Sequence, residues 1–201
     1  MSVRARTSGR APVELVDSDH GAERGVAERF GSPEAVLRFL AAVLRAKSVV
    51  EVDGSTPTAL ALCEGMVAEG TLTCITLDTE VQSSVRSAVA EAEMSTHRLR
   101  MITEVASGVL PKLAEGTYDL VHVVVGSART ASLLELATPL LRPGGTLVLN
   151  GAFERDEGSD RFGADGGPRM PREVLHAIHT DPRLVPVALP TGSGLLAIAR
   201  D

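Results

Sequence analysis

The sequence is poor in aromatic residues, with no Trp, one Tyr and four Phe among its 201 residues. Its core must therefore be built from Ala, Val and Leu, and few rings are available on which nucleic-acid bases could stack. Basic residues are also fewer than acidic ones, 20 against 26, so the formal net charge is −6. Such a chain has no general electrostatic attraction to nucleic acid or to anionic lipid. We expect neither as a partner.

Long hydrophobic runs are missing as well, since the longest are far shorter than the ~20 residues that a membrane span needs. No apolar segment follows Arg4, Arg6 and Arg10, which argues against a secretory leader there. The two cysteines, Cys63 and Cys74, lie in apolar surroundings, where buried free thiols are expected rather than a disulfide. We therefore expect a protein of the cytoplasm.

The remaining composition, 44% hydrophobic and 23% charged, is typical of one globular domain. Residues 1–30 are polar and show little periodicity, so we expect a loosely ordered arm there, with at most a short helix near Val13–Val16. The folded domain is expected over residues 31–201. Its first helix is predicted to have Ser32 as N-cap and Pro33 as first residue.

From residue 48 onward, segments with strand-like and helix-like patterns alternate. The predicted strands are Ser48–Val52, Leu72–Leu77, Leu99–Thr103, Tyr118–Val125, Thr146–Leu149, Val185–Leu189 and Leu195–Ala199. The predicted helices between them are Thr56–Val67, Glu80–Glu93, Val105–Leu113, Thr130–Leu141 and Pro171–Thr180. Residues 154–170 are predicted to form a long loop. This order predicts an α/β, doubly wound, seven-stranded and mostly parallel sheet, in which the antiparallel last strand is a reversed edge strand.

Four segments carry a likeness to a known family. They are Val49-Val50-Glu51-Val52, Thr117-Tyr118-Asp119-Leu120-Val121, the "LLRPGG" run that begins at Leu140, and the ending from Asp181 to Ala197. Their order and spacing resemble class I S-adenosylmethionine-dependent O-methyltransferases of the catechol and caffeoyl-CoA O-methyltransferase branch. The resemblance implies a Rossmann-like methyltransferase fold, S-adenosylmethionine (SAM) as cofactor, a small-molecule acceptor and a homodimer.

The resemblance also implies where the cofactor would lie. The implied cofactor-binding residues are Glu51, Asp53, Gly54, Ser55, Asp78 and Val124. In the family, the turn after the first strand is rich in glycine, which lets the backbone approach the methionine end of the cofactor. Here Asp53 brings a negative charge to that turn and is expected to oppose the cofactor's carboxylate. Ordinary capping of the next helix by Asp53, Ser55 and Thr56 is the favoured alternative interpretation.

The second strand of relatives ends in an acid that holds the ribose hydroxyls. Alignment places Thr76 at that position, with Asp78 two residues further on. Because residues i and i+2 of a strand lie on the same side, Asp78 could substitute for the missing acid. Capping of the helix that follows is an equally good interpretation of Asp78.

The resemblance also locates the ligands that a divalent metal would need in the catechol-type branch. Those positions are occupied by Val124 and by the pair Asn150-Gly151, and the family's nearby lysine is replaced by Ser127. Oxygen ligands suit Mg²⁺, and only Asn150 keeps one. We therefore predict no metal site and a reaction that is independent of metal.

Other candidate chemistry comes from histidines and one arginine. His176 and His179 share a helix face at a spacing that can bind metal, but a solvated surface is the preferred interpretation. His122 is predicted to be a hydrogen-bonded core residue, with a general base as the alternative. Arg129, just beyond the fourth strand, could contact an anion or simply be solvated.

Three hypotheses follow for the function. The first is a working, metal-independent O-methyltransferase, because positioning alone can supply much of the rate of methyl transfer. The second is a non-catalytic binding or partner subunit that keeps the fold and has lost SAM. The third, another nucleotide-binding Rossmann protein, is weakest because no G-x-G-x-x-G motif is present.

Overall fold

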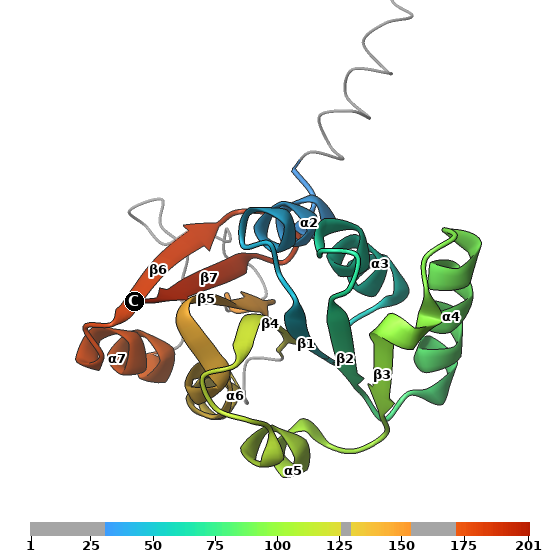
Figure 1. Cartoon of the computed structure of the whole chain (residues 1–201). Helices are drawn as coiled ribbons and strands as arrows, with labels where there is room; N and C mark the ends of the chain where they lie inside the picture. Colours follow the sequence, from blue (N-terminus) through green and yellow to red (C-terminus); the bar gives the residue numbers. More distant parts are fainter. Residues whose placement is uncertain (1–30, 126–129, 154–171) are drawn as a thin grey trace, which may run out of the picture.

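The computed structural model describes residues 31–125, 130–153 and 172–201. Within them seven strands form one sheet in the order β3-β2-β1-β4-β5-β7-β6 (Figure 1). The strands are β1 (Ser48–Val52), β2 (Thr71–Ile75), β3 (Leu99–Ile102), β4 (Tyr118–Val124), β5 (Leu141–Asn150), β6 (Leu184–Leu189) and β7 (Leu195–Arg200). The predicted seven-stranded α/β fold is confirmed.

Helices cover both faces of this sheet (Figure 1). One face carries α2 (Pro33–Val43), α3 (Thr56–Gly65) and α4 (Thr79–Glu91). The other carries α5 (Ala106–Val109), α6 (Thr130–Ala137) and α7 (Arg172–Thr180). Three short 3-10 helices complete the described elements: η1 (Thr96–Arg98), η2 (Leu110–Lys112) and η4 (Thr138–Leu140). Each face buries its own apolar cluster, as a doubly wound sheet requires.

Strand β7 is the one that runs against its neighbours. It pairs antiparallel with β5 on one side and with β6 on the other. The predicted antiparallel last strand is confirmed, but the expectation that it would be an edge strand is wrong. After α7 the chain enters the sheet at β6, two places beyond β5, and the hairpin then places β7 between them. The edge is therefore β6.

The residues of β1 alternate between the two faces of the sheet, as pleating requires. Val50 and Val52 belong to the cluster under α5, α6 and α7, whereas Val49 belongs to the cluster under α2, α3 and α4. Glu51 therefore points toward the second of these clusters, and only 2% of its surface is exposed. Its direct neighbours across the sheet are Cys74 on β2 and His122 on β4.

Most predicted boundaries lie within one or two residues of the observed ones, but α5, α6 and β5 differ more, and α5 ends at Val109 where the 3-10 helix η2 begins. Helix α6 ends at Ala137 and the chain becomes extended at Leu141, so the Arg142–Gly145 run lies inside β5 rather than ending a helix. The pairing of β4 with β5 shifts its register between Tyr118 and Leu120, which accommodates these residues as an irregularity of the strand.

A buried carboxylate organises the amino ends of the central strands. Asp119 on β4 accepts hydrogen bonds from the amides of Lys47 and Ser48 at 2.7 and 2.9 Å, and from Arg142 Nε at 2.7 Å. Burial alone would raise the pKa of Asp119, but the Ser48 and Lys47 amides and the Arg142 guanidinium together hold it below its usual value. Two of the sequence segments that carry the family likeness thus meet at one ion pair.

Several expectations fall outside the described residues: the arm over residues 1–30 with its helix at Val13–Val16, the positions of Ser127 and Arg129, and the loop over 154–170. Among the helices of the described part of the chain, none is long and apolar enough to cross a membrane.

Candidate functional site: the turn after β1 and the carboxylate beneath it

The turn between β1 and α3 keeps an unusual backbone shape. Asp53 has a φ of +50°, in the left-handed region that glycine adopts freely and that Asp and Asn tolerate better than other residues. Its amide donates to the carbonyl of Ile75 at 2.9 Å, which ties the turn to the end of β2. Asp53 is exposed and does not cap α3, contrary to the capping interpretation. The sequence therefore retains a glycine-like turn without a glycine at that position.

Ser55 is the residue that caps α3. Its hydroxyl accepts from the amide of Thr58, and the Thr58 hydroxyl accepts from the amide of Ser55 at 2.8 Å, which forms a capping box. Thr56 is the first residue of the helix and Pro57 the second, where a missing amide proton costs little. Capping is thus confirmed for Ser55 and is wrong for Thr56.

The Glu51 carboxylate lies directly beneath this turn and is held by three side chains. Thr58 Oγ1 donates to Oε1 at 2.6 Å, His122 Nδ1 lies 3.1 Å from the same oxygen, and Cys74 Sγ lies 3.8 Å from Oε2. The donors come from α3, β4 and β2. A carboxylate that accepts from several buried donors is satisfied without solvent, so Glu51 is turned into the domain.

Gly54 rests against that carboxylate. A Cβ atom at Gly54 would come within 2.2 Å of both Cδ and Oε1 of Glu51. No other residue fits here unless Glu51 moves. The glycine is thus required by contact with Glu51, in addition to any approach of a cofactor.

His122 is completely buried, as the sequence predicted for a core histidine. Its Nδ1 faces Glu51, and among the described residues its Nε2 has no hydrogen-bond partner. Val121 and Val123 flank it along β4 and are also fully buried. The hydrogen bond to Glu51 is the polar contact that fixes the ring.

Asp78 is the N-cap of α4, and this interpretation is confirmed. Its Oδ1 accepts from the amides of Glu80 and Val81 at 2.8 and 3.1 Å. Both bonds use one oxygen, and no described residue is assigned as a donor to Oδ2. Thr76, at the position of the family's ribose acid, is buried, and its hydroxyl accepts from the amide of Asp78 at 3.2 Å. Thr76 and Asp78 thus lie together at the end of β2.

A small cavity lies between these groups. It has a volume of about 10 Å³, close to the space that one water molecule needs. It is lined by Glu51, Gly54, Cys74, Ile75, Thr76, Val81, Gln82, Val85 and Met101. The Gln82 amide also donates to the Thr76 carbonyl at 3.1 Å. The ends of β1 and β2 therefore meet in a closely packed corner that contains both polar and apolar side chains.

The positions of the family's metal ligands meet on the next pair of strands. Val124 and Asn150 are direct partners in the β4–β5 pairing, so these two positions lie side by side. Asn150 Oδ1 accepts from the Ser193 hydroxyl at 3.1 Å. Gly151 has a φ of +82°, and a Cβ there would lie 2.8 Å from the carbonyl oxygen of Val125. Backbone geometry thus favours glycine at this position.

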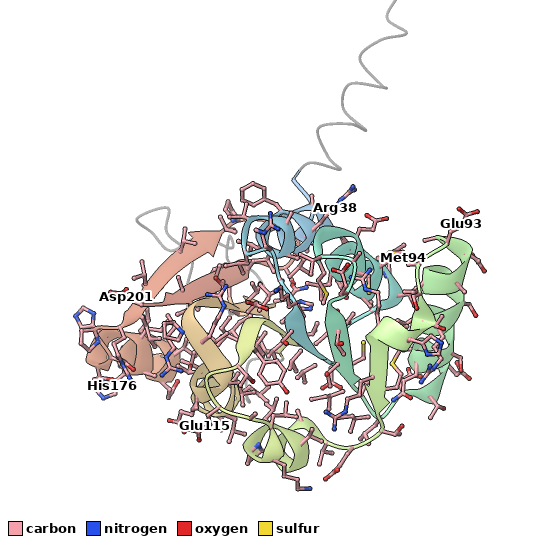
Figure 2. All side chains as sticks on the ribbon, viewed as in Figure 1. Arg38, Glu93, Met94, Glu115, His176 and Asp201 are labelled. Carbon is pink, nitrogen blue, oxygen red and sulfur yellow. The ribbon has the colours of Figure 1, made fainter. Side chains whose placement is uncertain are left out.

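The remaining sequence candidates lie elsewhere. His176 and His179 are exposed on α7, and Figure 2 shows His176 at the margin of the molecule.

Cys63 and Cys74 are buried free thiols, as expected. Burial raises the pKa of the Cys63 thiol to about 11 and raises that of Cys74 further. Within 31–125, 130–153 and 172–201, no group of three His, Cys, Asp or Glu residues is arranged to hold a metal ion.

Sequence reasoning missed Thr58, which joins the helix cap to the Glu51 carboxylate. Its signal was present, because a polar residue three positions after an N-cap serine is the spacing of a capping box. The Glu51–His122 contact gave no such signal, since the two residues are 71 positions apart and meet only through strand register.

Comparisons with known proteins agree with this architecture. A family model described as "Methyltransferase domain" matches residues 35–151, more than half of the chain. A protein of Mycolicibacterium vanbaalenii, named "Putative O-methyltransferase", is 38% identical over 83% of this chain and 74% of its own length.

Solved structures match as well. A protein from Corynebacterium glutamicum superposes with a TM-score of 0.69 at 25% identity, covering 94% of this chain and 92% of its own. The O-methyltransferase TomG from Streptomyces achromogenes, involved in tomaymycin synthesis and solved in complex with SAM, superposes with a TM-score of 0.65 at 21% identity. The overlap covers 83% of this chain and 78% of that one.

The fold, with its glycine-like turn after β1, defines a Rossmann-like protein of the methyltransferase class. The chain belongs to the methyltransferase-domain family that its sequence matches, and the resemblance found in the sequence is confirmed.

Proposed function

We propose that the protein is a SAM-dependent O-methyltransferase that transfers a methyl group to a small-molecule hydroxyl without a divalent metal. The observation that carries this proposal is the turn at Asp53. It keeps left-handed backbone geometry at the carboxyl end of β1, next to the end of β2, where doubly wound sheets bind their ligands.

We assign each residue at this end of the sheet a separate role in holding SAM. The backbone of Asp53, Gly54 and Ser55 would face the methionine portion, and Asp78 Oδ2 with the Thr76 hydroxyl would face the ribose. Glu51 would support the turn from below. The cofactor supplies an activated methyl group on a sulfonium, and the protein supplies the orientation that brings a hydroxyl in line with it.

Metal independence is supported by Val124 and Gly151. Val124 has no atom that could bind a cation, and Gly151 is favoured by its backbone geometry. A hydroxyl acceptor must then be positioned by protein groups alone, and its proton must pass to a base or to solvent as the C–O bond forms.

Calorimetric titration with SAM tests the first part of this proposal. We expect one molecule bound per chain, with weak affinity because of the Asp53 charge. Formation of S-adenosylhomocysteine in the presence of phenolic acceptors should be the same with Mg²⁺ and with EDTA. Activity that disappears with EDTA and returns with Mg²⁺ would refute metal independence.

A non-catalytic relative remains the second candidate, and one observation favours it. The Glu51 carboxylate accepts hydrogen bonds from side chains within the protein rather than being left open to a ligand. The titration separates the two, because a folded protein that takes up no SAM would support the non-catalytic function.

We further propose a homodimer in the cytoplasm. Strand β6 pairs on one side only among the described residues, and its Val185 and Val187 are 59% and 52% exposed. Association through this edge would cover them. The two buried free thiols suit a reducing compartment. Light scattering should give twice the chain mass of 21.0 kDa, and Val187→Lys should lower it toward the monomer value.

A further inference from the structure

A chain of hydrogen bonds runs from the centre of the sheet to the candidate cofactor turn. It starts at His122 Nδ1, passes to Glu51 Oε1 at 3.1 Å, continues to Thr58 Oγ1 at 2.6 Å and ends at the amide of Ser55 at 2.8 Å. Each link joins a different element: β4, β1, α3 and the turn itself. The shape of the turn is thereby connected to a residue on β4 that the proposed function does not use.

The histidine at the start of this chain is in an environment that would suit an apolar residue. It is 0% exposed, its direct partner on β5 is the fully buried Val148, and among the described residues Nε2 has no partner. A ring nitrogen buried without a partner costs free energy that an apolar side chain would avoid. The contact with Glu51 is the compensating interaction, so the role of His122 is to hold that carboxylate.

The carboxylate in turn has two contacts that reach the turn. Gly54 packs against it, so closely that a Cβ atom would overlap it. Thr58 links it to the helix cap at Ser55. With 2% of its surface exposed, Glu51 contacts the turn above it rather than solvent.

We propose that His122 is a positioning residue for the cofactor turn: it fixes the Glu51 carboxylate, which fixes Gly54 and, through Thr58, Ser55. Its effect on SAM affinity rests on the proposed function, whereas its effect on the turn does not.

Two substitutions separate positioning from simple packing. His122→Phe keeps a ring of similar size and removes the donor to Glu51, whereas His122→Asn keeps an N–H donor near the position of Nδ1. Amide resonances of Gly54 and Ser55 should move in His122→Phe and return toward their original positions in His122→Asn. The Kd for SAM should rise about tenfold in His122→Phe, with His122→Asn within about threefold of the original protein.

Asp119→Asn is the matched control, because it weakens another buried carboxylate network at the opposite end of the strands. It should lower stability while leaving the Gly54 and Ser55 resonances and the SAM Kd unchanged. If it raises the Kd as much as His122→Phe does, affinity follows general stability and the proposal is overturned.

If His122→Phe does not fold, the unsubstituted protein still gives an answer. The ring nitrogens of His122, followed by ¹⁵N NMR, should shift when SAM is added, although the ring is buried beneath the turn. An unchanged ring signal at saturating SAM would overturn the proposal.

A protein that binds no SAM would refute the proposed function alone. The amide resonances would then decide the inference: movement in His122→Phe with recovery in His122→Asn upholds it, and unmoved Gly54 and Ser55 resonances overturn it.

Discussion

The two ends of the central strands each contain a buried carboxylate, but the two are held in different ways. Asp119, at the amino end, accepts from two backbone amides and from the Arg142 guanidinium. Glu51, at the carboxyl end, is held within the described part of the chain by side chains alone, those of Thr58, His122 and Cys74. Backbone amides stay in place as long as the strands do, whereas side chains can change rotamer. Asp119 thus serves the fold, whereas the contacts of Glu51 are the ones that we propose to shape the cofactor turn.

The largest effect should come from Asp119→Ala. Removing the carboxylate leaves two amides and a guanidinium without their acceptor, which should cost about 3 kcal/mol of unfolding free energy. Urea denaturation would measure it. Because this network lies at the amino ends of the strands, SAM affinity should not change. A large change in affinity with little loss of stability would reverse the roles assigned to the two ends.

Thr58→Val should have the next largest effect. It removes a buried hydroxyl that donates to Glu51 and accepts from the Ser55 amide, at a cost of about 2 kcal/mol. Thr58→Ser keeps the hydroxyl and should lose less than half as much in the same denaturation experiment. Equal losses in the two variants would mean that the methyl group, rather than the hydroxyl, is what matters.

Asp53→Gly tests the turn directly. Removing the charge should tighten SAM binding about tenfold if ~1.4 kcal/mol of repulsion is relieved. Asp53→Asn is the matched control, because Asn tolerates the left-handed backbone and carries no charge. If Asn gives the same gain as Gly in a calorimetric titration, charge is the cause. A gain with Gly alone would assign the effect to backbone freedom.

Asp78→Ala should have a smaller effect, on both the stability of the protein and its affinity for SAM. It should cost about 1 kcal/mol of stability through loss of the α4 cap and should also weaken SAM binding. Asp78→Ser restores a cap but offers no carboxylate for the ribose, so stability should recover in thermal unfolding while affinity should not. Full recovery of affinity with Ser would limit Asp78 to capping.

The smallest effect should be the pH dependence of the unfolding free energy, which comes from Asp119 at the amino end of the strands. The pKa of Asp119 is lowered in the folded protein, so its contribution to stability is complete above its unfolded value of about 3.9 and is lost as the pH falls through the lower folded value. Unfolding free energy should therefore fall more steeply below about pH 4 in the original protein than in Asp119→Asn. Parallel pH profiles for the two proteins would contradict this.

Helices and strands were predicted with the right bounds wherever the local preferences of the residues agreed with the tertiary structure. Strand β1 was predicted with its observed bounds because Ser48–Val52 is rich in β-branched residues and is followed by a clear helix start at Thr56-Pro57. Strand β5 was predicted too short because Pro143, Gly144 and Gly145 are turn residues by local preference. The irregular pairing with β4 lets them continue the strand, and that pairing depends on tertiary structure.

The candidate site was predictable in its outline and not in its contacts. Family likeness placed Asp53, Gly54 and Ser55 in the turn after β1. The left-handed backbone of Asp53 and the Glu51–His122 pair depend on how β1, β2 and β4 pack, so no local pattern could have supplied them.

A SAM titration followed by ¹H–¹⁵N correlation spectra tests most directly whether the Glu51 end of the sheet binds the cofactor. The account predicts saturable shifts at the amides of Asp53, Gly54 and Ser55, with Lys47 and Ser48 beside Asp119 unmoved. A titration that leaves the turn unchanged, or that shifts only residues at the Asp119 end, would contradict it.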